Sequence, residues 1–149
     1  MEEIVVLQGI QDLLEQNFLL LLHIEEVILP NGEFIPLSPD GDHSNITVDE
    51  MNRRFVIQQS GNYCVQYKLL LSGSPGLVTL AIVLNGNRIN DSSEICDITT
   101  SGLFISSPFY MSLNTGDSIQ IRNYTGSAIT IVSNSGGYGF TYRVVKYRV

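Results

Sequence analysis

Charged side chains are scarce in this chain of 149 residues. They make up 15% of it, whereas an ordinary soluble domain carries about 25%. Hydrophobic residues account for 44%, and at this length one core buries roughly 70% of the surface that the unfolded chain exposes. The apolar surface left over by a single core predicts burial against other subunits.

Basic residues are the scarcer of the two charge types. The chain has 8 Lys and Arg against 15 Asp and Glu, which gives a net charge of −7. This balance argues against binding to nucleic acid, because such binding needs a basic surface. The acids also gather early, since residues 1–52 contain no Lys or Arg. The asymmetry predicts that the two ends of the chain attract each other, although a random surface distribution explains it equally well.

Long apolar runs and cysteines are few. The longest apolar run, residues 18–22, is far shorter than the about 20 residues that a membrane-spanning helix needs. Glu2 and Glu3 stand where a secretory signal carries Lys or Arg. We therefore expect neither a membrane span nor a signal peptide. Cys64 and Cys96 are too few for a disulfide framework, so they form two thiols or one bridge.

The residue patterns of known catalytic sites are also missing. Metal-dependent jelly-roll enzymes need two or three histidines on adjacent strands, but this chain has only His23 and His43, without a His-x-His pair. It contains neither the Gly-x-Ser-x-Gly motif of serine hydrolases nor a phosphate-binding glycine loop. The sequence therefore predicts a protein that is not an enzyme and that carries no resident cofactor.

Calcium is the one ion for which candidate ligands exist. Asp40 and Asp42 flank Gly41 in a polar loop, and Asp49 and Glu50 follow. Calcium prefers several hard oxygen ligands on a flexible loop. The spacing matches no established ligand pattern, so a solvated acidic loop is the favoured interpretation and a calcium site at Asp40 and Asp42 the weaker one.

Strand patterns dominate the chain from residue 18 onward. Short segments rich in β-branched and aromatic residues are separated by Gly, Pro, Asn and Asp, which predicts about ten strands in one all-β jelly-roll sandwich over residues 18–149. The expected strands fall in residues 19–29, 46–48, 55–57, 63–71, 77–84, 95–99, 103–113, 118–123, 128–132 and 138–149.

Residues 1–17 form a separate segment ahead of the sandwich. Leu7, Leu14 and Leu21 recur every seven residues, which favours a short helix that links or trimerises the chain. A helix of barely two heptads is marginal alone, and strands fit part of the same residues.

Side chains along a strand alternate between its two faces, so apolar residues spaced by two predict the core. This rule selects Phe55, Tyr63, Val65, Tyr67, Leu84, Ile119, Ile121, Phe140, Tyr142 and Val144. In the last strand Val145, Tyr147 and Val149 make the opposite face apolar too, whereas an antiparallel strand in a monomeric sandwich has one wet face. The second face predicts contact with a symmetry mate; the alternative is a last strand that is merely apolar. The predicted interface comprises Arg143, Val145, Tyr147, Val149, Cys64 and Gln66.

The order of several short motifs resembles the C1q/tumour-necrosis-factor-like superfamily. The motifs are Phe55-x-Ile57 followed by Gly61-Asn62-Tyr63-Cys64-Val65, then Val83-Leu84-Asn85-Gly86-Asn87, then residues 113–121, and a last strand that runs to the end of the chain. Residues 27–37 are similar to a segment in the C-terminal heads of collagen-like glycoproteins on the exosporium of bacterial spores. The Gly-x-y collagen repeat of those glycoproteins is missing here.

This resemblance implies a homotrimeric, non-catalytic structural or interaction module in a spore or cell surface layer, with surface-layer proteins or glycans as further partners. It also implies that the first and last strands are neighbours, so that Glu25 and Glu26 lie near Arg143, Lys146 or Arg148. The alternative function is a ligand-binding head, either lectin-like or receptor-binding, with calcium as an optional aid to binding. Its candidate contact residues are Tyr110, Tyr124 and Tyr138.

Overall fold

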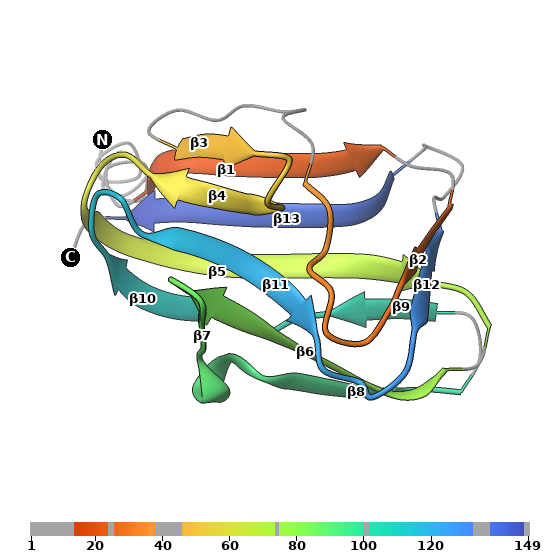
Figure 1. Cartoon of the computed structure of the whole chain (residues 1–149). Coiled ribbons are helices and arrows are strands. Elements are labelled where there is room, and N and C mark those ends of the chain that lie inside the picture. Colours follow the sequence, from red (N-terminus) through yellow and green to blue (C-terminus); the bar gives the residue numbers. More distant parts are fainter. Residues whose placement is uncertain are drawn as a thin grey trace, which may run out of the picture.

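The computed structural model of the chain describes residues 14–23, 26–37, 46–73, 75–99, 102–132 and 138–147. These residues form two antiparallel sheets that pack face to face (Figure 1). The helix that accompanies them is a single 3-10 turn, Asn90–Ser92. Within the described ranges, no helix has the length and apolar character to cross a membrane. The predicted all-β jelly-roll sandwich is confirmed.

Sheet A contains the long strands. Its main order is β1 (Leu14–His23), β13 (Tyr138–Tyr147), β5 (Gly61–Leu71), β12 (Ile129–Val132) and β2 (Glu26–Leu29). The other side of β5 pairs with β9 (Gly102–Ile105) and β10 (Phe109–Leu113). The first and last strands are thus neighbours, as the resemblance implies.

Sheet B lies opposite. Its order is β3 (Ile46–Asp49), β4 (Arg54–Ile57), β11 (Ser118–Asn123), β6 (Gly76–Leu84) and β7 (Asn87–Arg88), and β8 (Glu94–Ile98) also pairs with β6. The segment after β2 extends this sheet, because the amide of Ile35 donates to the carbonyl of Ile121 at 2.9 Å. This segment therefore sends Ile35 and Leu37 into the core.

The described residues form thirteen strands, and two of the predicted strands are each divided. Residues 103–113 break into β9 and β10 at Ser106, whose hydroxyl accepts a hydrogen bond from the amide of Tyr67 at 2.9 Å and so takes the place of a regular backbone partner. Pro108, which follows, has no N–H to offer. Residues 19–29 divide because β1 pairs with β13 whereas β2 pairs with β12.

The predicted N-terminal helix is wrong at its C-terminal end. Strand β1 begins at Leu14, which pairs with Tyr147, so residues 14–17 are strand. Hydrogen bonding of β1 along the whole of β13 stabilises the strand, whereas a heptad pattern of this length is too short to stabilise an isolated helix. Residues 2–13 of the predicted helix lie outside the described residues.

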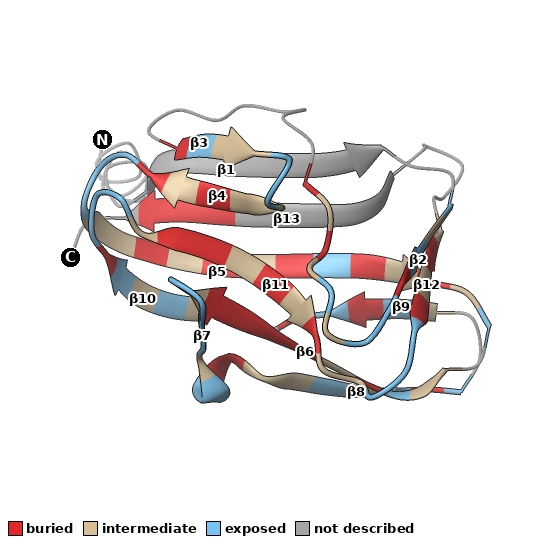
Figure 2. Cartoon of the chain, in the orientation of Figure 1, coloured by how far each residue is buried: buried red, intermediate tan, exposed pale blue. Residues whose placement is uncertain are grey.

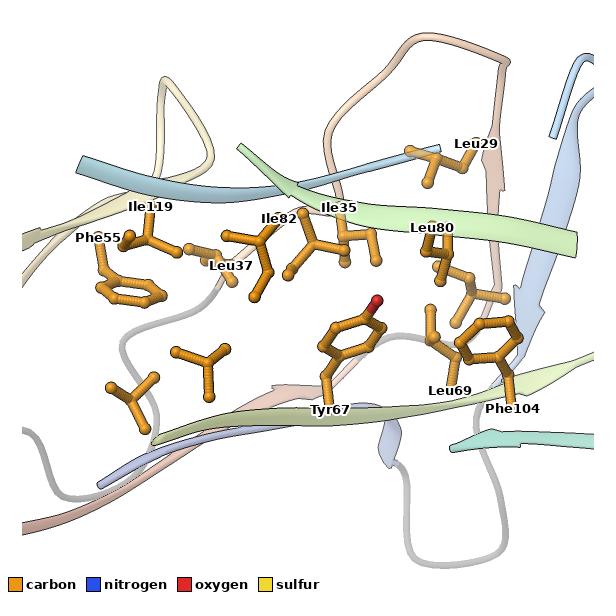
Figure 3. Close-up of a cluster of buried hydrophobic side chains, with 14 of the residues drawn as sticks. Leu29, Ile35, Leu37, Phe55, Tyr67, Leu69, Leu80, Ile82, Phe104 and Ile119 are labelled. Carbon is orange, nitrogen blue, oxygen red and sulfur yellow. The ribbon is translucent and has the colours of Figure 1, made fainter. Parts of the chain in front are cut away.

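The core lies between the two sheets (Figure 3). Seven of the predicted core residues are at most 3% exposed: Phe55, Tyr63, Val65, Tyr67, Ile119, Ile121 and Val144. Leu84 is half-buried and packs against them, while the side chains of Phe140 and Tyr142 lie outside the described part of the structure. Figure 3 shows the hydroxyl of Tyr67 pointing from β5 toward the opposite sheet. Burial raises the pKa of this phenol, which keeps it neutral at physiological pH.

Glu26 and Lys146 do not lie near each other, contrary to the expectation. Glu26 pairs with Val132, next to the end of β5 that holds Leu71. Lys146 pairs with Tyr63, near the opposite end of β5. The length of this strand separates the two charges. Glu25 and Arg148 lie outside the described residues, as does the side chain of Arg143.

The Asn85-Gly86 turn has the geometry that its sequence predicts. Both residues have positive φ, 50° and 83°, as the tightest hairpin turns require.

A Cβ added at Gly86 would meet nothing within 4 Å. We therefore expect Gly86→Ala to lower the free energy of unfolding by about 1 kcal/mol through backbone strain alone. Gly86→Asn is the matched control, because asparagine tolerates positive φ; urea denaturation should show a smaller loss for it, and equal losses would contradict this explanation.

Candidate functional site

One edge of the sandwich is apolar on its outside. Among the described residues, seven large hydrophobic side chains are exposed, and five of them lie on β6, β8, β9 and β10. These five have exposed fractions from 51% to 63%. Leu103, Ile105 and Tyr110 lie on the outer face of sheet A, whereas Leu77 and Ile95 lie on the outer face of sheet B. We call this set the apolar edge. Figure 2 shows exposed segments along β8, β9 and β10 at this margin.

The apolar edge is also a margin of the hydrogen-bonded sheets. Strands β9 and β10 pair with β5 on one side, and no described strand pairs with their other side. Strand β8 closes sheet B at the same margin, since β8 and β9 lie in contact. An exposed, apolar strand edge promotes association with another chain unless it is covered. The three exposed side chains of β9 and β10 and the open edge of sheet A therefore mark a surface suited to contact with a partner.

Four of the predicted interface positions lie side by side in sheet A, next to β10. Val145 pairs in register with Cys64, and Arg143 with Gln66, so strands that lie far apart in the sequence bring the four positions together. Cys64 and Gln66 are both half-buried. Cys64 forms no disulfide. The side-chain amide of Gln66 donates a weak hydrogen bond of 3.3 Å to the carbonyl of Ser106. The side chains of Arg143 and Tyr147 lie outside the described residues, and so does Val149.

Val145 differs from the expectation in one respect. It is only 6% exposed in a single chain, so most of its surface is already covered before any partner arrives. A charge at this position would disturb the protomer as well as any interface. Exposed residues of the apolar edge are therefore better sites for testing assembly.

Sequence reasoning missed Leu103 and Ile105. They flank Phe104, which is fully buried, so β9 is apolar on both faces. The same pattern singled out the last strand. Applied to residues 103–105, it would have identified this part of the edge.

The outer face of sheet B carries a different layer, built from arginines and aromatic rings. The guanidinium of Arg88 lies 4.0 Å from the ring centroid of Tyr124, and that of Arg122 lies 5.3 Å from the same centroid. Beneath them Ala81 and Val83, which pair with Arg122 and Arg88, are at most 3% exposed. Long arginine stems cover apolar surface well, so this layer explains why two outward-facing apolar residues are buried.

A groove of about 480 Å³ lies at the far side of sheet B from the apolar edge. One wall is the segment after β2, with Glu33 and Phe34, and the other is the turn between β3 and β4. The residues that line it are Glu33, Phe34, Met51, Asn52, Arg53, Arg54 and Gln120. None of the residues predicted for the interface lies here.

Asp49 organises the turn between β3 and β4. Its carboxylate accepts hydrogen bonds from Asn52 Nδ2 at 2.8 Å and from Arg54 Nε at 3.0 Å. Together these donors hold the pKa of Asp49 below its usual value, with the Asn52 side chain as the larger cause and partial desolvation opposing it. A lowered pKa means that this stabilisation is complete above the unfolded-state pKa and is lost as the pH falls through the folded-state value.

We therefore expect Asn52→Ala to raise the pKa of Asp49 toward its ordinary value. An NMR titration of the Asp49 carboxyl carbon would measure the shift. Gln120→Ala is the control, because the side-chain amide of Gln120 donates to the carbonyl of Asn52 and not to the carboxylate of Asp49. An unchanged midpoint in Asn52→Ala would contradict this assignment.

Metal-ligand chemistry has no support in the described part of the chain. No group of three or more His, Cys, Asp or Glu side chains gathers there. Asp40 and Asp42, the calcium candidates, lie outside the described residues, and calcium stays a prediction. Tyr110 lies on β10 of sheet A, whereas Tyr124 follows β11 and its amide donates to the carbonyl of Thr79 in sheet B. The side chain of Tyr138 is not among those described.

The chain is similar in fold to tumour-necrosis-factor proteins. A structure titled Eiger TNF from S. frugiperda aligns with a TM-score of 0.67 and 12% identity, covering 89% of this chain and 92% of that one. Murine APRIL at pH 5.0 aligns with a TM-score of 0.63 and 14% identity, covering 88% and 99%. No curated protein matches the chain by sequence.

Sequence comparison with protein families is more specific. The family model of the BclA C-terminal domain matches residues 24–147. The match spans the chain from the end of β1 to the end of β13. It agrees with the resemblance to the C1q/tumour-necrosis-factor-like heads, and the chain belongs to the family of the BclA C-terminal domain.

Proposed function

We propose that this chain is a non-catalytic, homotrimeric head in the surface layer of bacterial spores, the exosporium. Membership of the BclA C-terminal domain family supports the location. The apolar edge is the observation that carries the proposal of self-association, because Leu103, Ile105 and Tyr110 stand exposed on one face at the open margin of sheet A.

Threefold symmetry suits the two surfaces of sheet A. In a ring of three, each contact joins two different surfaces, one from each neighbour. The chain offers such a pair: the apolar edge on β8, β9 and β10, and the adjacent outer face around Cys64, Gln66 and Val145. Packing the edge of one copy against that face of the next would cover Leu103 and Ile105 and close the open margin of sheet A.

Native mass spectrometry of the intact chain tests this assembly. We expect a species near three times the 16.5 kDa mass of one chain. A protein that stays at the mass of one chain across the micromolar range would contradict it.

The location has a separate test. An antibody against the folded head should label intact spores, and labelling only after the outer layer is removed would contradict a surface position.

A further inference from the structure

We propose that the groove on sheet B binds an uncharged sugar unit of a glycan. The groove lies between the segment that carries Glu33 and Phe34 and the turn between β3 and β4. The proposal goes beyond the trimeric head, because the groove shares no residue with the apolar edge or with the predicted interface.

The groove presents hydrogen-bond acceptors whose orientation is fixed. The side-chain amide nitrogen of Asn52 donates a hydrogen bond to the carboxylate of Asp49 at 2.8 Å. That of Gln120 donates to the backbone carbonyl of Asn52, also at 2.8 Å. No described residue donates to the amide oxygen of Asn52 or of Gln120. With the carboxylate of Glu33, whose side chain is 56% exposed, the groove thus offers three acceptor groups to a ligand rich in hydroxyl donors.

Two arginines supply the complementary donors. The Nε of Arg54 donates to the carboxylate of Asp49, and no described residue accepts a hydrogen bond from the terminal nitrogens of Arg54. The Nη1 of Arg53 donates to the carbonyl of Phe34 at 2.9 Å. The same nitrogen lies 4.0 Å from Oε2 of Glu33, which is long for an ion pair. Guanidinium groups held in this way donate several hydrogen bonds in fixed directions.

The charges of the site balance, which favours a neutral ligand. Arg53 and Arg54 are matched by Glu33 and Asp49, both within 4.0 Å of a guanidinium nitrogen. An anion would gain little from this balanced field, because Asp49 already pairs with Arg54 and the carboxylate of Glu33 lines the groove. A sugar hydroxyl both donates and accepts, so it can use the acceptors and the guanidinium donors together.

Apolar surface completes the groove. The half-buried ring of Phe34 and the side chain of Met51, which is 91% exposed, both line it. The guanidinium of Arg122 lies over the Phe34 ring, 5.5 Å from its centroid, so Met51 supplies the larger part of the open apolar contact. Ligand sites commonly combine such apolar contact with a few fixed polar groups. A pyranose ring has this same mixture, with C–H groups on its faces and hydroxyls at its rim.

The backbone of the turn adds a separate observation. Arg53 has a φ of +54°, a conformation that an arginine adopts at a cost in free energy and that glycine or asparagine adopts readily. This conformation brings the guanidinium to the carbonyl of Phe34, across the groove. Strain of this kind is often retained where a side chain serves a site.

Ligand-observed saturation-transfer NMR tests the proposal. The probes are the methyl glycosides of glucose, galactose, mannose and N-acetylglucosamine, with glucuronate as the anionic comparison. We expect transfer to at least one neutral glycoside, reduced by about tenfold in Glu33→Gln and in Arg53→Gly, because each change removes a charged hydrogen-bonding group. Arg53→Gly also relieves the strained backbone and so keeps the turn folded.

Glu50→Gln is the matched control. Glu50 stands in the same turn but does not line the groove, so its change should leave binding intact. Absence of transfer to all four neutral glycosides, binding of glucuronate alone, or equal binding by Glu33→Gln and the wild type would each overturn the proposal. Native mass measured on the same samples separates this result from assembly, because a trimer that binds no glycoside would refute the groove alone.

Discussion

Ile105→Asp is expected to convert the trimer into folded monomers. Ile105 is 52% exposed in a single chain and stands beside Lys68 at the open margin of sheet A. In a lone protomer the new carboxylate would remain in water and cost little. In a packed interface it would be buried together with its cross-strand neighbour Lys68, and taking this charged pair out of water costs several kcal/mol at each of three contacts.

The comparison variant is Met51→Asp. Met51 is also exposed, at 91%, but it lies in the turn between β3 and β4, on the far side of sheet B from the apolar edge. Light scattering should give the mass of one chain for Ile105→Asp and of three for Met51→Asp. Circular dichroism should show folded sheet in both variants. A trimeric Ile105→Asp would remove the apolar edge from the interface.

Phe104→Ala is expected to cost about 3–5 kcal/mol of unfolding free energy. Phe104 is fully buried, and its ring stacks on that of Tyr67 with centroids 6.3 Å apart and an interplanar angle of 7°. Removing it opens a cavity between the sheets where β9 meets β5. Because domains of this size are stable by only about 5–15 kcal/mol, the loss is a large fraction of the total.

The measurement should be made in the Ile105→Asp background. Assembly would otherwise add a concentration-dependent contribution to the apparent stability. Leu103→Ala is the matched control, since Leu103 adjoins Phe104 in sequence and is 51% exposed; urea denaturation should show a loss below about 1 kcal/mol for it. Similar losses in both variants would mean that β9 is not packed as described.

Alternation of apolar residues predicted much of the fold, because strand faces repeat every two residues. It identified Tyr63, Val65 and Tyr67 as one row of β5, and all three are buried. The Asn85-Gly86 turn followed from local backbone preference in the same way. Local rules succeed where neighbouring residues alone decide the conformation.

Those rules fail where distant residues decide. Nothing near Ser106 in sequence shows that its hydroxyl would accept the amide of Tyr67 and split one predicted strand into two. The strand at Leu14 likewise depends on Tyr147, at the other end of the chain. The groove on sheet B joins Glu33, Arg53 and Gln120, which no spacing in the sequence relates.

The measurement that tests self-association through the apolar edge most directly is hydrogen–deuterium exchange of residues 102–113. If copies of the chain cover this edge, these amides exchange slowly in the wild type and in Met51→Asp, and faster in Ile105→Asp, while residues 54–57 of β4 exchange alike in all three. Equally fast exchange of residues 102–113 in all three proteins would show that the edge is open in solution, and would contradict the proposed head assembly.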